Sequence, residues 1–181
     1  MHRPKMERKT RILEQKFFNR PTLVVARELL GKYLVRAYRG KVTARMITEV
    51  EAYDGLKDKG SHASRGMTKR NAVMFGEAGY WYVYFTYGMH WLVNIVTGPK
   101  DHPAAVLLRG MEGVAGPARL TKFLRIDGAL TGKKADKSSG LWIEDRGIKI
   151  PLSKIKKGPR VGIDYAGHYW AAKKWRFWID D

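Results

Sequence analysis

The chain has 181 residues, which fits one domain, and its 44% hydrophobic fraction can build a sizeable core. It carries 35 Lys and Arg against 17 Asp and Glu, so its formal net charge is +18 at pH 7. An excess of this size predicts a polyanionic partner, most often nucleic acid; a merely basic surface is the alternative. The absence of cysteine excludes disulfides, thiolate zinc sites and thiol nucleophiles.

Residues 1–16 are basic and poor in apolar residues, which predicts an arm that frays or lies on a polyanion. They lack the apolar core of a secretory signal, and no stretch of the chain approaches the ~20 apolar residues of a membrane span. We therefore expect no secretion, no membrane partner, and a single domain over residues 17–181.

The first elements are expected between residues 19 and 40. Asn19-Arg-Pro21 predicts a helix start, with Asn19 near the N-cap and Pro21 near the first helical position, and Gly31 suits the helix end. Lys32–Tyr38 is typical of a strand, and Arg39-Gly40 predicts the turn of a hairpin.

Residues Val42–Asp54 alternate between apolar and polar side chains, which is typical of a half-buried strand. The polar face includes Glu49 and ends in Glu51 and Tyr53, where a strand can hold a reactive carboxylate at the rim of a cleft. On this stretch alone, an ordinary solvated strand face is the commoner explanation. The pattern does not choose between the two carboxylates.

Residues 55–74 predict a polar, glycine-bearing loop, and a loop of this length inside a compact domain is more often functional than idle. His62, Arg65, Lys69 and Arg70 lie in it. The alternatives are a surface histidine and a solvated basic surface.

Residues 78–97 are the richest in aromatic side chains. Tyr80, Tyr82 and Tyr84 share one face of an expected strand, which can stack planar rings or pack under a helix. Tyr87 falls in the following turn, where a large aromatic has little packing reason to be, and wedging between stacked bases is one functional reason.

Further elements are expected in the second half of the chain: a buried strand over Ala104–Arg109, a helix over Pro117–Ile126, a short strand within Leu141–Ile150, and closing strands at Val161–Ile163 and Trp175–Ile179. Leu120, Phe123 and Leu124 are expected to form the core face of the helix. The basic run Lys154–Arg160 is a candidate for a nucleic-acid surface.

Several motifs of known chemistry are absent. Gly132-Lys133 fails the phosphate-binding loop pattern, no G-x-G-x-x-G opens a helix after a strand, and no G-x-S-x-G is present. No pair among the five histidines has metal-ligand spacing, so we expect no zinc site. Chemistry in this chain would depend on carboxylate, tyrosine, histidine and arginine side chains acting with water.

Several separated stretches of the chain together match the sequence pattern of one protein family. They are Leu30–Val35, Glu49–Tyr53, Ser61-His62, Ser64–Gly66, Asn71, Met74-Phe75, Gly79–Met89, Asn94 and Val106–Arg109, followed by Gly116-Pro117, Leu120, Arg160–Ile163 and Trp175–Phe177. In order and spacing, they resemble the alkyladenine (3-methyladenine) DNA glycosylase family. The resemblance implies a mixed α/β (α+β) domain with a curved antiparallel sheet, close to an open barrel, and surrounding helices.

The resemblance also implies an activity. The family flips damaged purines, alkylated or deaminated, out of duplex DNA and hydrolyses the N-glycosidic bond in base excision repair, without a metal or organic cofactor. Glu51 matches the general base, and Arg109 matches an arginine that holds the attacking water and contacts a phosphate. Tyr87 matches the residue that fills the gap in the DNA. The base pocket would comprise Tyr53, His62, Tyr82, Tyr84, Asn94 and Leu107, and the DNA surface would include Arg65, Lys69 and Arg70.

By the same resemblance we expect a monomer that acts on double-stranded DNA, in the cytoplasm at the nucleoid of a prokaryote or in the nucleus of a eukaryote. His90-Trp91 and Lys173-Lys174 depart from the family pattern, near the pocket mouth and the last strand respectively. The alternatives are a non-catalytic nucleic-acid-binding module, a bifunctional glycosylase-lyase with an amine nucleophile, and a sugar hydrolase that pairs Glu49 with Glu51.

Overall fold

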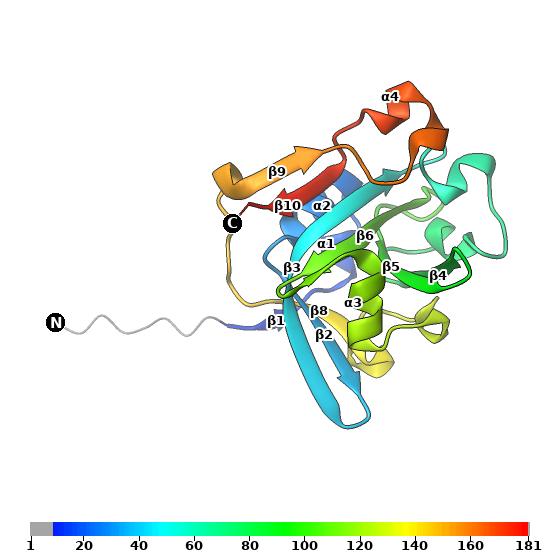
Figure 1. Ribbon diagram of the computed structural model, residues 1–181. Coiled ribbons are helices and arrows are strands. Elements are labelled where there is room, and N and C mark those ends of the chain that lie inside the picture. Colours follow the sequence, from blue (N-terminus) through cyan, green and yellow to red (C-terminus); the bar gives the residue numbers. More distant parts are fainter. Residues whose placement is uncertain (1–8, 181) are drawn as a thin grey trace.

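The computed structural model describes residues 9–180 (Figure 1). The first half of the expected N-terminal arm, residues 1–8, lies outside the described residues. Its last part joins the domain, because Arg11–Ile12 pairs with a strand near residue 144 and Leu13 is buried. Among the described residues, no helix is long and apolar enough to cross a membrane.

The described chain forms one antiparallel sheet of ten strands that does not close into a barrel. The strands are β1 (Arg11–Ile12), β2 (Tyr33–Tyr38), β3 (Lys41–Asp54), β4 (Trp81–Thr86), β5 (His90–Val96), β6 (Ala104–Met111), β7 (Val114–Ala115), β8 (Leu141–Asp145), β9 (Ile155–Gly158) and β10 (Arg176–Ile179). The main order is β1-β8-β2-β3-β6-β5-β4; β7 pairs with β6, and β10 joins β3 to β9. The expected single mixed α/β domain with an open antiparallel sheet is confirmed.

Helices pack around this sheet, with α2 against β3 and β6, and α3 against β5 and β6 (Figure 1). The α-helices are α1 (Gln15–Phe18), α2 (Thr22–Leu29), α3 (Pro117–Leu124) and α4 (His168–Ala171). Short 3-10 segments are η1 (His62–Arg65), η2 (Ala72–Phe75), η3 (Gly128–Leu130), η4 (Lys137–Ser139), η5 (Leu152–Lys154) and η6 (Asp164–Ala166).

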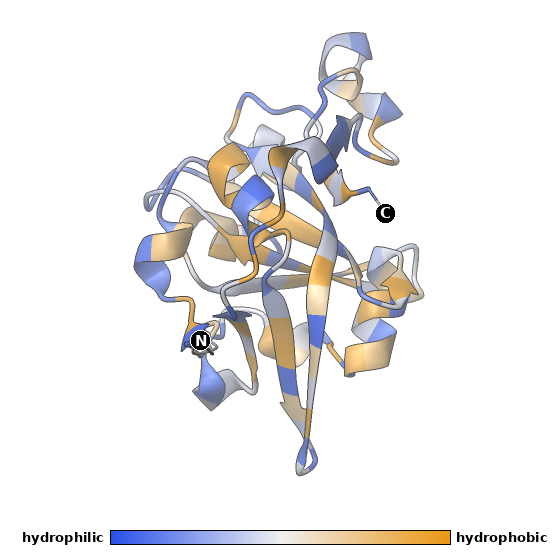
Figure 2. Cartoon of the chain, turned by 90° about the vertical axis from the view of Figure 1, so that its left-hand side faces the viewer, coloured by the Kyte–Doolittle hydropathy of each residue, from blue (hydrophilic) through white to orange (hydrophobic). Residues whose placement is uncertain are grey.

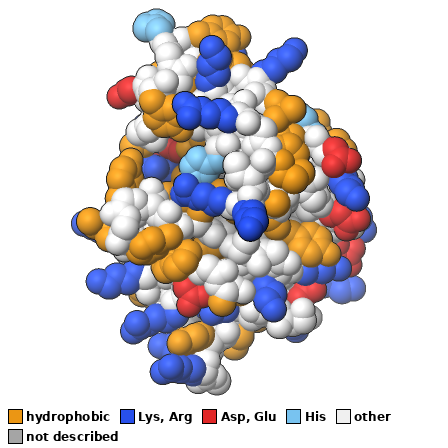
Figure 3. Space-filling view, turned by 90° about the vertical axis from the view of Figure 1, so that its right-hand side faces the viewer, with side chains coloured by type: hydrophobic (Ala, Val, Ile, Leu, Met, Phe, Trp, Pro, Cys, Tyr) orange, Lys and Arg blue, Asp and Glu red, His pale blue; other side chains and the backbone are white. Residues whose placement is uncertain are grey.

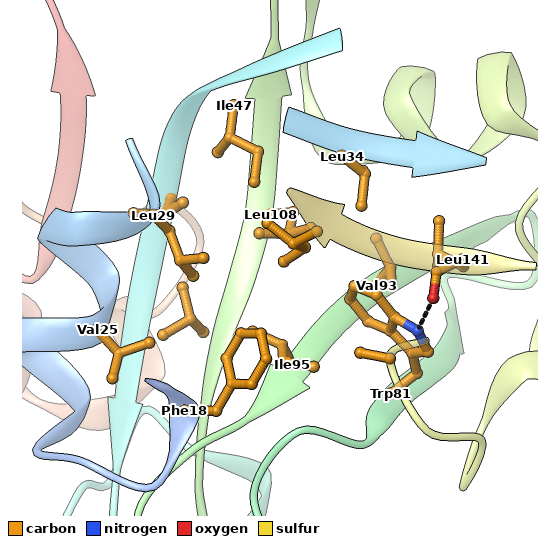
Figure 4. Packing of buried hydrophobic residues seen from close by; sticks show 14 of the residues in the cluster. Phe18, Val25, Leu29, Leu34, Ile47, Trp81, Val93, Ile95, Leu108 and Leu141 are labelled. Carbon is orange, nitrogen blue, oxygen red and sulfur yellow. Dashed lines mark hydrogen bonds between the residues drawn. The ribbon is translucent and has the colours of Figure 1, made fainter. Parts of the chain in front are cut away.

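The core lies where α1 and α2 meet the middle of the sheet (Figure 4). Phe18, Leu29, Ile47 and Leu108 are fully or almost fully buried there. Trp81 lies in the same cluster, and its indole N–H donates to the carbonyl oxygen of Leu141 at 3.0 Å, so this buried donor is satisfied (Figure 4). Figure 2 shows the hydrophobic segments on the central strands and a hydrophilic tip on the projecting β2–β3 hairpin.

The long strand β3 changes the face that it buries. Its pairing with β6 shifts by one residue between Ile47 and Glu49 and shifts back between Glu49 and Val50, so the two strands share an irregularity here that resembles a β-bulge. Before the irregularity the odd-numbered Ile47 is buried in the core, and after it the even-numbered Val50 and Ala52 are. Unbroken alternation would place Ile47 and Glu51 on one face, so the irregularity is what releases Glu51 from the core side.

Most expected elements are present, with corrections at particular ends. The α2 helix begins at Thr22 with Pro21 as its N-cap, because Asn19 ends the preceding helix α1. Phe123 is wrongly expected in the core: it is about half exposed and its ring lies beside the Arg45 guanidinium.

The expected closing strand at 161–163 is also absent. These residues form a bend. The backbone N–H of Val161 donates to a carboxylate instead of to a neighbouring strand.

Candidate active site

A cavity of about 350 Å³ lies where β3, β4, β5 and β6 meet the loops around residues 60 and 162. It is lined by most of the expected site residues: Glu51, Tyr53, His62, Tyr82, Tyr84, Tyr87, Asn94, Leu107 and Arg109. Figure 3 shows this side of the molecule, with Lys, Arg and His side chains beside a hollow. The structure therefore brings together residues that are spread over nearly 60 positions of the chain.

Glu51 is fully buried, yet its carboxylate has polar partners on both oxygens. The N–H of Val161 donates to Oε1 at 2.7 Å, and the Tyr53 hydroxyl donates to Oε2 at 2.8 Å. The Arg109 guanidinium lies 3.4 Å from Oε1. Burial raises the pKa of Glu51, while Arg109, the Val161 N–H and Tyr53 oppose that rise because they favour the charged form. The result is a carboxylate that is ionisable, positioned and more basic than an exposed glutamate.

Glu49 lies on the same strand but has a different environment. Its Oε1 accepts from Arg109 Nε at 3.1 Å and from Arg176 Nη1 at 3.1 Å. Glu49 does not line the cavity, whereas Glu51 does. Arg109 thus connects the two carboxylates, and only Glu51 is placed to meet a molecule in the cavity.

Aromatic rings from β3, β4 and η1 form the cavity walls. His62 Nδ1 and the Tyr82 hydroxyl form a hydrogen bond of 3.0 Å, and the His62 ring meets Tyr84 edge-on at 4.5 Å between centroids. Desolvation against these rings, with the nearby Arg70 charge, lowers the pKa of His62 to about 4. Burial raises the pKa of Tyr82 to about 12 and that of Tyr84 further. At neutral pH these walls are therefore uncharged.

Asn94 and Leu107 also line the cavity, and both are almost fully buried. Leu107 pairs across the sheet with both Glu51 and Asn94, so the sheet register fixes their relative positions. The amide of Asn94 donates to the carbonyl oxygen of Tyr82 at 3.1 Å. This bond orients the buried side chain and leaves its oxygen as an acceptor.

Tyr87 lies at the tip of the β4–β5 hairpin, with 83% of its surface exposed. Its φ is +52° and that of Gly88 is +66°, the left-handed pair of a tight hairpin turn. Left-handed backbone is unfavourable for a tyrosine, so the turn holds this ring outward at some cost in stability.

The expected basic residues fall into separate environments. Arg65, Lys69 and Arg70 are exposed, and Arg70 donates to the carbonyl oxygen of Phe85 and lies over the Tyr84 ring. Arg160, expected within an exposed basic run, is instead buried, because it forms an internal ion pair. The lysines of that run do not line the cavity.

Sequence reasoning missed the structural support of the site. Arg160 forms a fully buried, bidentate ion pair with Asp58, at 2.6 and 2.8 Å, and its guanidinium also lies 4.8 Å from the ring centroid of Tyr53 and 5.0 Å from that of Trp175. The pair connects the 55–60 loop to the segment that carries Val161. Arg160 and Val161 belong to a stretch that resembles the family. Asp58 is one of several charged residues in its loop, and no pattern in the sequence distinguishes it.

Among residues 9–180, no group of three or more His, Asp or Glu side chains could hold a metal ion. The chemistry that the cavity can perform with its own groups is water activation. A buried carboxylate beside an arginine can accept a proton from a bound water molecule, and uncharged rings around it can enclose a planar ligand.

Comparison with known proteins shows the family of the chain. The family model for methylpurine-DNA glycosylase matches residues 16–181. A protein of Streptomyces avermitilis named "Putative 3-methyladenine DNA glycosylase" is 42% identical over 93% of this chain and 88% of its own length. Proteins of the same name from Methanocella arvoryzae and Legionella pneumophila are 42% and 41% identical, covering 92% and 94% of this chain and 92% and 96% of their own lengths. The chain belongs to the methylpurine-DNA glycosylase family.

Proposed function

We propose that this DNA glycosylase flips alkylated or deaminated purines out of duplex DNA and hydrolyses their N-glycosidic bond without cutting the strand. It would thereby begin base excision repair. The observation that carries the proposal is the setting of Glu51: a buried carboxylate, bonded to Val161 and Tyr53 and close to Arg109, in a cavity with aromatic walls.

The reaction needs a water molecule beside C1′ of the damaged nucleotide. Glu51 accepts a proton from this water as the water oxygen attacks C1′, and the electrons of the broken bond leave with the purine. The carboxylate charge stabilises the positive charge that develops on the sugar. Arg109, 3.4 Å from Glu51, holds the water and keeps the carboxylate ionised. Metal ions and organic cofactors take no part in this scheme.

The cavity walls select the base. Tyr53, His62 and Tyr84 sandwich a planar purine, and a ring face attracts a cationic alkylated base by roughly 0.5–2 kcal/mol. Because the pKa of His62 is about 4, the histidine adds no positive charge that would repel such a base at neutral pH. Tyr82 holds the histidine ring in place through its hydrogen bond.

Asn94 and Leu107 limit what can reach the inner end of the cavity. Asn94 disfavours the exocyclic amine of guanine, and Leu107 packs near the flipped nucleotide. Both are nearly fully buried, so neither can move aside without disturbing the sheet.

Flipping leaves a gap in the DNA stack. Tyr87, held outward at the hairpin tip, fills this gap, as inserted apolar side chains do in other proteins that distort DNA. Arg65, Lys69 and Arg70 contact phosphates, and the net charge of +18 draws the protein to DNA. We expect it to work as a monomer, in the cytoplasm of a prokaryote or the nucleus of a eukaryote.

A single-turnover assay tests the proposal. Duplex oligonucleotides carrying one hypoxanthine or one ethenoadenine are incubated with wild type, Glu51→Gln or Glu49→Gln, and abasic sites are revealed with alkali. Wild type should release the base. Glu51→Gln should lose roughly 10²–10⁴-fold in rate while still binding the duplex. Glu49→Gln should lose much less, because Glu49 lies outside the cavity.

Other outcomes favour other functions. Tight DNA binding by all proteins with no base release, from these lesions or from methylated DNA, would indicate a non-catalytic binding module. A covalent adduct trapped by borohydride, with strand cleavage before alkali, would indicate a glycosylase-lyase that uses an amine nucleophile.

A further inference from the structure

Tyr165 is an exposed aromatic residue beside the active-site cavity. It lies in η6, lines the cavity, and has 69% of its surface exposed. Its hydroxyl donates to the carbonyl oxygen of Gly60 at 2.8 Å. This hydrogen bond positions the ring, although the core does not bury it.

Tyr165 also lines a second hollow that adjoins the first. This hollow, named here the basic groove, has a volume of about 690 Å³ and is lined by Lys59, Ser61, His62, Ser64, Arg65, Thr68, Arg70, Asn71 and Tyr165. Ser61, His62 and Tyr165 line both hollows. The cavity has aromatic walls, whereas the groove has cationic and hydroxyl side chains, so Tyr165 lies where an aromatic site meets a basic one.

A nucleotide has these same two parts. Its base is planar and suits the aromatic cavity, its phosphate is anionic and suits the basic groove, and its sugar lies between them. We propose that Tyr165 is a substrate-binding residue whose ring packs against the flipped nucleotide at the junction of the cavity and the basic groove. The proposal rests on the proposed function, since it assumes that a nucleotide enters this cavity.

The anchor of Tyr165 is itself held firmly. The N–H of Gly60 donates to Asp58 Oδ1 at 3.0 Å, and a Cβ atom at Gly60 would lie 2.8 Å from Arg160 Nη2. The buried Asp58–Arg160 pair thus fixes the carbonyl that accepts from Tyr165. A ring ordered before the ligand arrives loses little conformational entropy on binding, which favours a role in binding.

Two variants distinguish the contribution of the ring from that of its hydrogen bond. Tyr165→Ala removes the ring, and Tyr165→Phe removes only the hydrogen bond to Gly60. Tyr169→Ala is the matched control, because Tyr169 is similarly exposed, at 67%, and does not line the cavity. Each protein is assayed for single-turnover release of ethenoadenine across enzyme concentrations, and for its affinity for the lesion duplex relative to undamaged duplex.

Tyr165→Ala should raise the half-saturating enzyme concentration by roughly 5- to 150-fold, the range for losing an aromatic contact with a nucleotide. Tyr165→Phe should raise it by roughly 2- to 10-fold. Tyr169→Ala should match wild type, and all melting temperatures should stay close to that of wild type. If wild type releases the base and the half-saturating concentration of Tyr165→Ala is within twofold of the wild-type value, the role of Tyr165 is overturned and the proposed function stands. Absence of base release by wild type would overturn both.

Discussion

The buried ion pair between Asp58 and Arg160 allows a quantitative prediction. Asp58 accepts both guanidinium N–H groups at 2.6 and 2.8 Å and also the backbone N–H groups of Asp54 and Gly60. In Asp58→Asn one acceptor oxygen becomes an NH₂ group that faces donors, and the Arg160 charge stays buried. Arg160 Nε already has no hydrogen-bond partner among the described residues. Little in the surroundings can therefore compensate for the lost carboxylate.

Breaking a buried pair on one side costs about 3–5 kcal/mol in the free energy of unfolding. In a protein of this size, 1 kcal/mol corresponds to about 2–4 °C in melting temperature, so Asp58→Asn should melt roughly 6–20 °C lower. Thermal unfolding followed by circular dichroism measures the shift. Glu28→Gln is the matched control, because its partner Arg20 is also close, at 2.7 Å, but the pair is exposed. An exposed pair contributes only about 0–1 kcal/mol.

A double variant completes the test. Asp58→Asn with Arg160→Met removes the buried charge together with its partner, so it should be destabilised by less than the sum of the single variants. The reasoning would be refuted if Asp58→Asn melted within about 2 °C of wild type, because its shift would then be no larger than the one expected for the exposed pair in Glu28→Gln.

Three further outcomes follow from the site. The melting temperature of wild type relative to Glu51→Gln should fall as the pH rises above the ordinary glutamate value of about 4.3, because burial raises the pKa of Glu51 and ionising it costs more in the folded state than in the unfolded state. His62 should titrate in nuclear magnetic resonance spectra with a midpoint near pH 4. Because this pKa lies below the unfolded value of about 6.5, the neutral histidine contributes fully to stability above about pH 6.5, and this contribution is lost as the pH falls toward 4. Tyr87→Gly should relieve left-handed strain and raise the free energy of unfolding by up to about 1 kcal/mol, while excision from duplex DNA falls.

Local patterns predicted the elements well where one residue type decides the conformation. Arg39-Gly40 predicted a hairpin turn, and both residues have positive φ there. Pro117 predicted the start of α3, and Gly116 is its N-cap. These signals are local because the backbone conformation depends on the residue itself.

The remaining features depend on partners far away in the chain. The irregularity near Glu49 arises from pairing with β6, and alternation alone cannot reveal it. Asp58 and Arg160 meet across 102 positions, and Val161 gives its N–H to a side chain 110 positions away. The family resemblance therefore identified nine of the residues that line the cavity, but the pairs that hold them in place could be found only in the folded structure.

Glu51 and the groups that enclose it belong to parts of the fold with different mechanical support. Strand β3 is hydrogen-bonded to β6 on one side of Glu51 and to β10 on the other, so the amides next to Glu51 should exchange with solvent only when the whole domain unfolds. Residues 62–75 are mainly loops and short 3-10 turns outside the buried Asp58–Arg160 pair, so they open at lower free energy. Under the proposed function, opening of this side of the cavity would admit and release a nucleotide while the carboxylate keeps its place.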